Sequence, residues 1–364
     1  MTTIFIKGLG LIGSSLTRAI RKRHPTFTII GNDADPQTTA YALKHHLIDQ
    51  STRELTAAVA ADFIILATPV TEIINDLQQL AQLPLKKSVI ITDVGSTKQA
   101  VLKAALPLQE KGITFIGGHP MAGSHKTGVT AGRADLFENA FYFMIKTKVP
   151  DDAYLALQNL LQGAHVKWLL LSAQEHDQLV GQISHLPHVI AAALVNQTQV
   201  FFADSPLGMR MAAGGFKSIT RIASSDPTMW SSILQSNSAI IIQQISQYVN
   251  ELQKIQKAIM EDDHDQIFSF FKTAKNSRDE LGPEKVGQLP NFFDLFINIP
   301  DQVGALAAIT QLLALNKINL VNIHILEIRE DLDGVLQLTF MRENDRAQAV
   351  KILTHAHYTI LRKD

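Results

Sequence analysis

Hydrophobic residues are concentrated in short runs along the first part of the chain, and amphipathic stretches separate these runs. The runs predict strands at 3–7, 27–32, 62–67, 88–93, 113–117, 141–146 and 167–171. Helix-like stretches such as 12–23 and 151–163 lie between several of them. Because this alternation is typical of a parallel β-sheet that helices cover on both faces, we predict an α/β domain over residues 1–173.

The pattern changes after residue 173, since residues 174–281 contain no convincing strand. Apolar side chains recur there at helical spacings of three and four, at Ile245, Tyr248, Leu252, Ile255 and Ile259. We therefore predict an all-α domain over residues 174–284. This apolar stripe fits an intrachain core and a seam between two copies equally well, because periodicity alone does not separate them.

A third pattern follows a linker that we place at residues 285–291. Two prolines and two glycines within 282–291 interrupt regular structure there. The remaining chain predicts, in order, strand 292–298, helix 303–316, strand 319–328, strand 334–341, helix 344–354 and strand 357–362. Because this βαββαβ order is typical of a ferredoxin-like fold, we predict an α+β domain over residues 292–364.

Composition narrows the class of protein. The 364 residues exceed the size of one ordinary hydrophobic core, which stops growing at about 250–300 residues. A net charge of −1 gives no sign of a nucleic-acid or membrane-surface partner. The absence of cysteine excludes disulfides, thiolate catalysis and cysteine-ligated zinc. No leader pattern and no run of 18 apolar residues is found, so we expect a cytoplasmic protein without a membrane span.

The first strand leads into the sequence Gly8-Leu9-Gly10-Leu11-Ile12-Gly13, which opens the first helix. In this G-x-G-x-x-G pattern Gly8 allows a tight turn, Gly10 a close approach of a pyrophosphate, and Gly13 close packing of helix on strand. The free N–H groups of the helix start, around Leu11 and Ile12, attract phosphates. The pattern predicts a Rossmann-type dinucleotide site, and the alternative is a glycine-rich turn without a ligand.

Asp33 lies 20 residues after Gly13, at the end of the second predicted strand. A carboxylate at that position accepts hydrogen bonds from a ribose 2′-hydroxyl and repels a 2′-phosphate, so we predict NAD rather than NADP. The alternative is that Asp33 only caps a helix. Two further loops follow predicted strands and should face the nicotinamide: Thr68-Pro69 and Gly95-Ser96. Asp93 should brace the second loop.

His119 is the best placed of the 13 histidines to act as a base. It ends the strand predicted at 113–117, in the rigid sequence Gly117-Gly118-His119-Pro120. Removal of a hydride from an alcohol requires a base for the hydroxyl proton, and histidine is the commonest one. The alternative is an ordinary loop histidine.

A second histidine cluster comprises Ser184-His185-Leu186-Pro187-His188, with His176 upstream. His185 and His188 are three residues apart and would share one side of a helix. A zinc pair would need a third ligand at a suitable spacing, which the sequence lacks, so we predict no metal. Structural histidines behind a helix cap at Ser184 are as plausible as a substrate site.

A third cluster lies within residues 214–230, where Lys217 and Arg221 are four residues apart. Two fixed cations suit a substrate with more than one carboxylate, and arginine binds a carboxylate with two parallel hydrogen bonds. The alternative is a solvated basic surface. Asp226-Pro227 predicts a helix start, with Asp226 as its cap.

These motifs, in this order, resemble the prephenate dehydrogenase family of tyrosine biosynthesis. The resemblance rests on the segments 8–13, 93–98, 118–124, 184–188 and 214–227. It implies oxidative decarboxylation of prephenate to 4-hydroxyphenylpyruvate, with reduction of NAD⁺, in a homodimer that associates through the helical domain. The two carboxylates of prephenate would explain two cations.

The resemblance also implies roles for single residues. His119 would take the proton of the substrate hydroxyl, and Ser96 would support it beside the nicotinamide. Arg221 would bind a substrate carboxylate. The substrate pocket would be lined by His188, His185, Lys217 and Trp230.

Two positions depart from the family pattern. His125 stands where some relatives carry a glutamate at the pocket entrance, and Ser218 replaces a common aspartate. These departures concern substrate entry and the binding of the carboxylate rather than the reaction.

The C-terminal domain resembles an ACT domain, a module that binds amino acids. Its entry segment, residues 298–306, includes Asp301 and Gly304, and Asn319 and Asn322 lie near its second strand. The resemblance implies feedback inhibition by L-tyrosine through these residues. The alternative is a dimerisation module that binds no ligand.

Two other functions compete with this reading. Arogenate dehydrogenase performs the same chemistry on a substrate with an amino group in place of the side-chain keto oxygen, and one sequence separates the two poorly. The second is a catalytically silent sensor of NAD and amino acids. Such a sensor would not need Ser96, His119 and Arg221 together.

Overall fold

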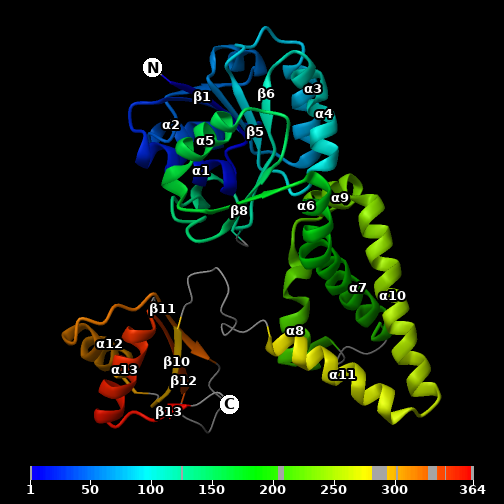
Figure 1. Cartoon of the computed structure of the whole chain (residues 1–364), viewed down its shortest axis with the longest axis vertical. Helices are drawn as coiled ribbons and strands as arrows, with labels where there is room; N and C mark the ends of the chain where they lie inside the picture. The colour runs from blue at the N-terminus through cyan, green and yellow to red at the C-terminus, as the bar shows by residue number, and fades with distance from the viewer. Residues whose placement is uncertain are drawn as a thin grey trace. The chain divides into compact units, whose positions relative to one another are not determined.

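The computed structural model describes residues 2–123, 126–203, 209–280, 293–300, 302–326, 334–340 and 342–361. These residues form two compact units, 1–251 and 252–364. Figure 1 follows the chain from blue to red through both units. The predicted linker 285–291 lies outside the described residues.

The first unit contains a parallel sheet with the strand order β3-β2-β1-β4-β5-β6. Its strands are β1 (Thr3–Lys7), β2 (Thr28–Asn32), β3 (Gln50–Thr52), β4 (Phe63–Leu66), β5 (Ile90–Asp93) and β6 (Thr114–Ile116). The order reverses beside β1, where the chain passes from one side of the sheet to the other. In such sheets a ligand binds outside the carboxyl ends of the strands at this point.

Helices cover both faces of this sheet (Figure 1). One face carries α1 (Leu11–Arg23), α2 (Pro36–Lys44) and α5 (Asp151–Leu160), and the other carries α3 (Val70–Leu80) and α4 (Gln99–Glu110). Successive residues of a strand point to opposite faces. Accordingly, Ile4 and Ile6 of β1 join one buried core and Phe5 joins the other. The predicted doubly covered sheet is confirmed.

A second, smaller sheet departs from the prediction. The strands expected at 141–146 and 167–171 do not extend the parallel sheet; instead β8 (Phe141–Ile145) pairs with β7 (Gly118–Pro120) and β9 (Lys167–Leu171). The chain leaves the first sheet at Gly118, whose N–H and C=O groups bind the side chains of Asp93 and Lys98. Strand β3 was not predicted, because its three residues Gln-Ser-Thr carry no apolar pattern.

The following residues are helical, and within the described part of 174–280 no strand occurs, as predicted. The helices are α6 (Ala173–Val180), α7 (Leu186–Phe201), α8 (Gly214–Thr220), α9 (Pro227–Ser236), α10 (Ser238–Met260) and α11 (His264–Asp279). A π-helical turn, Gly181–His185, joins α6 to α7. The helix cap considered at Ser184 is therefore wrong. The helix begins at Ser172, which forms a capping box with Glu175.

The helical stretch Ala173–Phe201 is long and apolar enough to span a membrane by length and composition, although none was expected. Three of its polar side chains, His176, Asp177 and His185, are buried inside the protein. Buried polar groups of this kind require protein partners. These three side chains lie in the interior of the protein, although only 28% of the apolar window is buried.

The α/β part and the start of the helical part belong to one compact unit, residues 1–251, and the domain boundary expected at residue 173 stays a prediction. The backbone N–H of Thr71 donates to Ser232 Oγ at 3.3 Å, and Thr97 Oγ1 donates to Ser236 Oγ at 2.9 Å. Both serines belong to α9. The start of α3 and the loop after β5 are thereby attached to the helix that carries Trp230.

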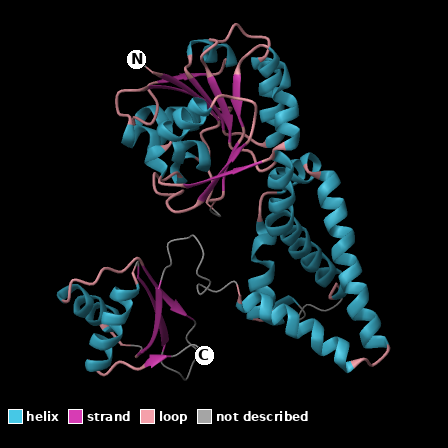
Figure 2. Cartoon of the chain, in the orientation of Figure 1, coloured by secondary structure: helices cyan, strands magenta, loops and turns pink. Residues whose placement is uncertain are grey.

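The second unit contains the predicted βαββαβ element order (Figure 2). Its elements are β10 (Phe293–Ile299), α12 (Ala305–Leu315), β11 (Asn322–Leu326), β12 (Gly334–Phe340), α13 (Glu343–His355) and β13 (Ile360–Leu361). The strands form an antiparallel sheet with the order β11-β12-β10-β13. Alternate residues of β10, Leu295, Ile297 and Ile299, are buried against the two helices.

Candidate active site

The glycine loop has the geometry that a dinucleotide requires. Gly8 has a φ of +87°, and a Cβ atom on Gly13 would lie 1.9 Å from the carbonyl oxygen of Gly8. A Cβ atom on Gly10 would meet no protein atom within 4 Å. Packing therefore explains Gly8 and Gly13, whereas the space beside Gly10 is free for a ligand.

Asp33 is attached to the same loop at the end of β2. The backbone N–H of Leu9 donates to Asp33 Oδ2 at 2.7 Å, and the N–H of Asp35 donates to Asp33 Oδ1 at 3.0 Å. Asp35, rather than Asp33, caps α2. Because a carboxylate accepts about four hydrogen bonds, Asp33 retains the capacity to accept those of a ribose.

The loop after β4 contributes Thr68 and Pro69. Pro69 directly precedes α3. The hydroxyl of Thr68 is buried and has no hydrogen-bond partner among the described residues. Since buried polar groups normally have a partner, this orphaned hydroxyl fits a bound molecule at the carboxyl end of β4.

Asp93 connects the loop after β5 to the strand that carries His119. Its carboxylate accepts the N–H groups of Gly95 at 2.8 Å and Gly118 at 3.2 Å, which confirms its role as a brace. It also forms an ion pair with Lys98, whose side chain is fully buried. The Lys98 amine donates a second hydrogen bond to the carbonyl oxygen of Gly118 at 2.7 Å.

The ring of His119 is supported by a chain of side chains that the sequence analysis missed. His119 Nδ1 lies 2.9 Å from His176 Nε2, and His176 Nδ1 lies 2.8 Å from Asp177 Oδ1. The Asp177 carboxylate also accepts the N–H groups of Lys98 and Gln99, at 2.7 and 2.8 Å. His176 was noted only as an upstream neighbour, and nothing in its local sequence indicates a partner 57 residues away.

The surroundings keep His119 neutral. Its pKa is well below the ordinary value of 6.5, firstly because burial disfavours the charged ring and secondly because His176, Lys98 and His185 are nearby. Burial also lowers the pKa of His176, although Asp177 opposes this shift. A neutral imidazole has a free nitrogen lone pair, which a general base requires.

Ser96 lies in the same loop as Gly95 and is partly buried. Its hydroxyl makes no hydrogen bond to any of the described residues, so the expected support of His119 by Ser96 stays a prediction. The partner of the His119 ring in this structure is His176.

The second histidine cluster brings His188 and Trp230 together. Their rings stack with centroids 3.8 Å apart, and His188 Nδ1 lies 2.8 Å from the carbonyl oxygen of Ser184. Burial lowers the pKa of His188, and the nearby charge of Arg221 lowers it further. The positive charge of Arg221 therefore acts on the His188 ring of the stacked pair.

His185 occupies a different environment. It is only 1% exposed, and its ring lies edge-on to Trp230 with Nδ1 3.4 Å from Asn237 Nδ2. Burial lowers its pKa to about 4. His185 is therefore buried beside Trp230 and exposes almost no surface to a ligand.

Lys217 lies in α8 and Arg221 in the 3₁₀ turn that follows, and both are exposed. Their charges are therefore open to a ligand. The predicted helix start is confirmed, since Asp226 Oδ1 accepts the N–H of Met229 at 2.7 Å and Pro227 is the first residue of α9. Ser218 is exposed, and His125 lies outside the described residues. Among the described residues no group of three metal-binding side chains occurs.

Comparisons with known proteins now identify the family. Residues 16–170 match the nucleotide-binding domain of prephenate dehydrogenase, residues 172–273 its dimerization domain, and residues 293–355 the ACT domain. The prephenate dehydrogenase of Bacillus subtilis (strain 168) is 42% identical over 349 residues, which cover 95% of this chain and 94% of the relative. The chain belongs to the prephenate dehydrogenase family. The resemblance inferred from sequence is confirmed.

Further relatives agree with this membership. The prephenate dehydrogenase of Lactococcus lactis subsp. cremoris is 41% identical over 98% of both chains. The solved prephenate dehydrogenase of Aquifex aeolicus, in complex with hydroxyphenyl propionate and NAD⁺, superposes with a TM-score of 0.68 at 27% identity. The superposition covers 78% of this chain and 99% of the solved chain. The predicted fold, with Rossmann, helical and ACT parts, is confirmed.

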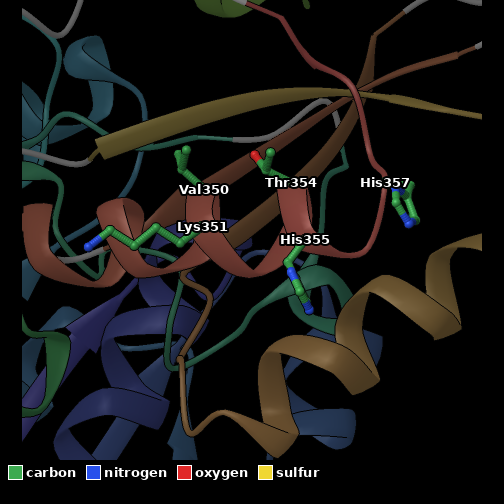
Figure 3. A pocket seen from close by; sticks show the side chains of 5 residues that line it. All are labelled: Val350, Lys351, Thr354, His355 and His357. Carbon is green, nitrogen blue, oxygen red and sulfur yellow. The ribbon is translucent and has the colours of Figure 1, made fainter.

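A separate hollow of about 600 Å³ lies on the ACT domain (Figure 3). It is lined by Val350, Lys351, Thr354, His355 and His357. All five come from the end of α13 and the turn after it, and their polar side chains are exposed. None of the residues expected to bind tyrosine belongs to this hollow.

Proposed function

We propose that this chain oxidises prephenate with NAD⁺ and releases carbon dioxide and 4-hydroxyphenylpyruvate, as a cytoplasmic enzyme of L-tyrosine biosynthesis. One observation carries the proposal. A neutral histidine, His119, lies at the carboxyl end of the Rossmann sheet with a buried hydrogen-bonded partner behind it. A nucleotide sensor has no need of such a base.

The residues of the cofactor site fit NAD. The space beside Gly10 can hold a pyrophosphate, and the carboxylate of Asp33 can accept hydrogen bonds from a ribose without a 2′-phosphate. The buried hydroxyl of Thr68, which binds none of the described residues, can form a hydrogen bond with the cofactor. The N–H groups of Leu11, Ile12 and Gly13 lie at the start of α1. NAD⁺ bound here supplies the acceptor for the hydride.

The protein's own groups then perform the remaining steps. His119 accepts the proton of the substrate hydroxyl at C4 as the hydride leaves that carbon. Ser96, whose hydroxyl binds none of the described residues, orients the substrate hydroxyl. Arg221 and Lys217 bind the carboxylates, and His188 contacts the pyruvyl end. Loss of carbon dioxide makes the ring aromatic, which renders the reaction effectively irreversible.

A spectrophotometric assay tests this proposal directly. Reduction of NAD⁺ and NADP⁺ is followed with prephenate and with arogenate, side by side. We expect the highest kcat/KM with prephenate and NAD⁺. Preference for arogenate would establish the alternative substrate, and no turnover with either would favour a sensor.

We also propose that the enzyme is a homodimer, because exposed positions of the α10 stripe lie within the segment matched by the dimerization domain. Leu252 is 47% exposed and Ile259 is 62% exposed. An apolar stripe of this kind is stabilised by a second copy. Sedimentation of Leu252→Glu/Ile259→Glu should show a monomer if the stripe is the seam.

Feedback inhibition by L-tyrosine is the regulatory part of the proposal. Its support is the ACT match at 293–355 and the left-handed Gly304, which directly precedes α12. Asn319 and Asn322 are exposed near β11, and Asp301 lies outside the described residues. Tyrosine should inhibit the full chain but not a chain that ends near Gln288, and equal inhibition of both would refute this assignment.

A further inference from the structure

We propose that Asp177 and His176 are positioning residues that fix the His119 ring in the tautomer with its proton on Nδ1, which leaves Nε2 free as the base. The inference rests on the proposed role of His119 and adds the groups that control it. Neither residue belongs to the motifs that carry the family resemblance. The hydrogen bonds from His119 to His176, 57 residues away in the sequence, and from His176 to Asp177 assign this role.

The direction of each hydrogen bond follows from the aspartate. An ionised carboxylate only accepts, so His176 Nδ1, 2.8 Å from Asp177 Oδ1, carries a proton. A neutral imidazole has one N–H, so His176 Nε2 is then an acceptor. His119 Nδ1, 2.9 Å from that nitrogen, must donate to it. The His119 Nε2 atom is left with its lone pair.

The reversed arrangement is unfavourable. If His176 carried its proton on Nε2, its bare Nδ1 would face Asp177 Oδ1 at 2.8 Å without a hydrogen between them. Two buried acceptors at that distance repel each other and lose a charge-assisted hydrogen bond. His119 Nδ1 would then accept a hydrogen bond from His176, and the ring would carry its own proton on Nε2, so Nε2 could not act as a base.

The chain of groups is held rigidly at its far end. The side chains of His176 and Asp177 are both fully buried. The Asp177 carboxylate is fixed by the N–H groups at the start of α4, and its backbone carbonyl accepts from Asn237 Nδ2 at 3.0 Å. Phe143 lies edge-on to both rings, at centroid distances of 6.3 Å from His119 and 5.5 Å from His176.

The charges around His119 and His176 are consistent with both rings being neutral. The charged groups that act on His176 are Lys98, Asp93 and Asp177. The groups that act on His119 are His176, Lys98 and His185. Burial lowers the pKa of both rings. When His119 takes the substrate proton, the negative charge of Asp177 stabilises the new imidazolium through His176.

Two variants test the assignment in the full-length enzyme. In Asp177→Asn the amide can donate to His176 and so reverse the direction of both hydrogen bonds. In His176→Gln the side chain can either donate to His119 or accept from it, so it does not fix the His119 tautomer. We expect kcat to fall by about 10²- to 10⁴-fold in each, with KM for prephenate little changed. His24→Gln and Asp49→Asn, which change the same residue types far from His119, should keep the native kcat.

The tautomer of His119 can be measured directly, and it would not change if His176 and Asp177 served only to stabilise the fold. With ¹⁵N-labelled histidine, the native enzyme should show His119 protonated on Nδ1, and both variants should lose this preference. Native enzyme with the proton on Nε2 would overturn the proposal. This measurement requires no variant, so it decides the question even if Asp177→Asn fails to fold after loss of a hydrogen bond to the start of α4.

The role of His119 as the base and the positioning role of His176 can be refuted separately. If His119→Asn keeps near-native kcat, the base assignment falls, and the inference falls with it. If His119→Asn is inactive but His176→Gln stays within twofold of the native kcat, only the positioning role falls. In the His119→Asn background, His176→Gln should cost nothing further, because the tautomer it controls is already absent.

Discussion

The buried amine of Lys98 binds the carbonyl oxygen of Gly118 at 2.7 Å and so holds the residue directly before His119. The same amine pairs with Asp93, whose carboxylate binds the N–H groups of Gly95 and Gly118. One buried ion pair therefore fixes the distance between the loop after β5 and the candidate base. Removal of one partner from such a pair is strongly destabilising, because it leaves an unpaired charge in the protein interior.

Replacement of Lys98 by methionine should strongly destabilise the first unit. Asp93 would remain as a buried charge without its partner, which costs about 3–5 kcal/mol. The free energy of unfolding in urea measures this loss. The control is Lys86→Met, which removes a surface pair with Asp62 whose side chains are 40% and 34% exposed. That change should cost no more than about 1 kcal/mol, and equal losses in both variants would contradict the assignment.

The pH dependence of kcat/KM should reflect the lowered pKa of His119. Because the neutral ring is the base, activity persists as the pH falls below 6.5 and is lost only on protonation at a lower pH. A histidine with an unshifted pKa would place the acid limb of the pH profile near pH 6.5. Measurement of kcat/KM from pH 4.5 to 8 gives the apparent pKa of this loss of activity. A value of 6.5 or higher would contradict the lowered pKa of His119.

Stability should also decrease on acidification. The folded state keeps His185 neutral, with a pKa lowered from 6.5 to about 4, so the unfolded chain binds a proton first as the pH falls. Each pH unit below 6.5, down to the folded pKa, should cost about 1.4 kcal/mol for this histidine. Unfolding free energies at pH 7 and 5.5 measure the slope. His185→Gln should reduce it, whereas substitution of the exposed His264 should not.

Two glycines of the cofactor loop should respond differently to alanine. Gly13→Ala places a methyl group 1.9 Å from the Gly8 carbonyl oxygen, so the native fold should lose about 1–3 kcal/mol. Gly10→Ala meets no protein atom within 4 Å, so stability should stay within about 0.5 kcal/mol. NAD⁺ should nevertheless bind about tenfold more weakly, because the methyl group occupies the space of the pyrophosphate. Calorimetry measures both quantities, and native NAD⁺ affinity in Gly10→Ala would refute this placement.

Several features were predictable from sequence because their causes are local. The G-x-G-x-x-G turn, the cap at Asp226 and the βαββαβ order each depend on residues within a few positions of one another. Backbone propensity and the period of apolar residues determine such features whatever lies beyond them. The order of motifs along the chain was likewise sufficient to indicate the family.

The sequence by itself thus determined the types of most elements, although not β3, together with the cofactor turn and the identity of His119 as a candidate base. Only the tertiary structure decided what surrounds that base. His176 meets it across 57 residues and is itself bound by Asp177, and Lys98 becomes fully buried beside Asp93. The physical reason is that hydrogen bonds and desolvation act through space. The pKa of His119 and the direction of its hydrogen bonds are properties of the packed core, which no local pattern encodes.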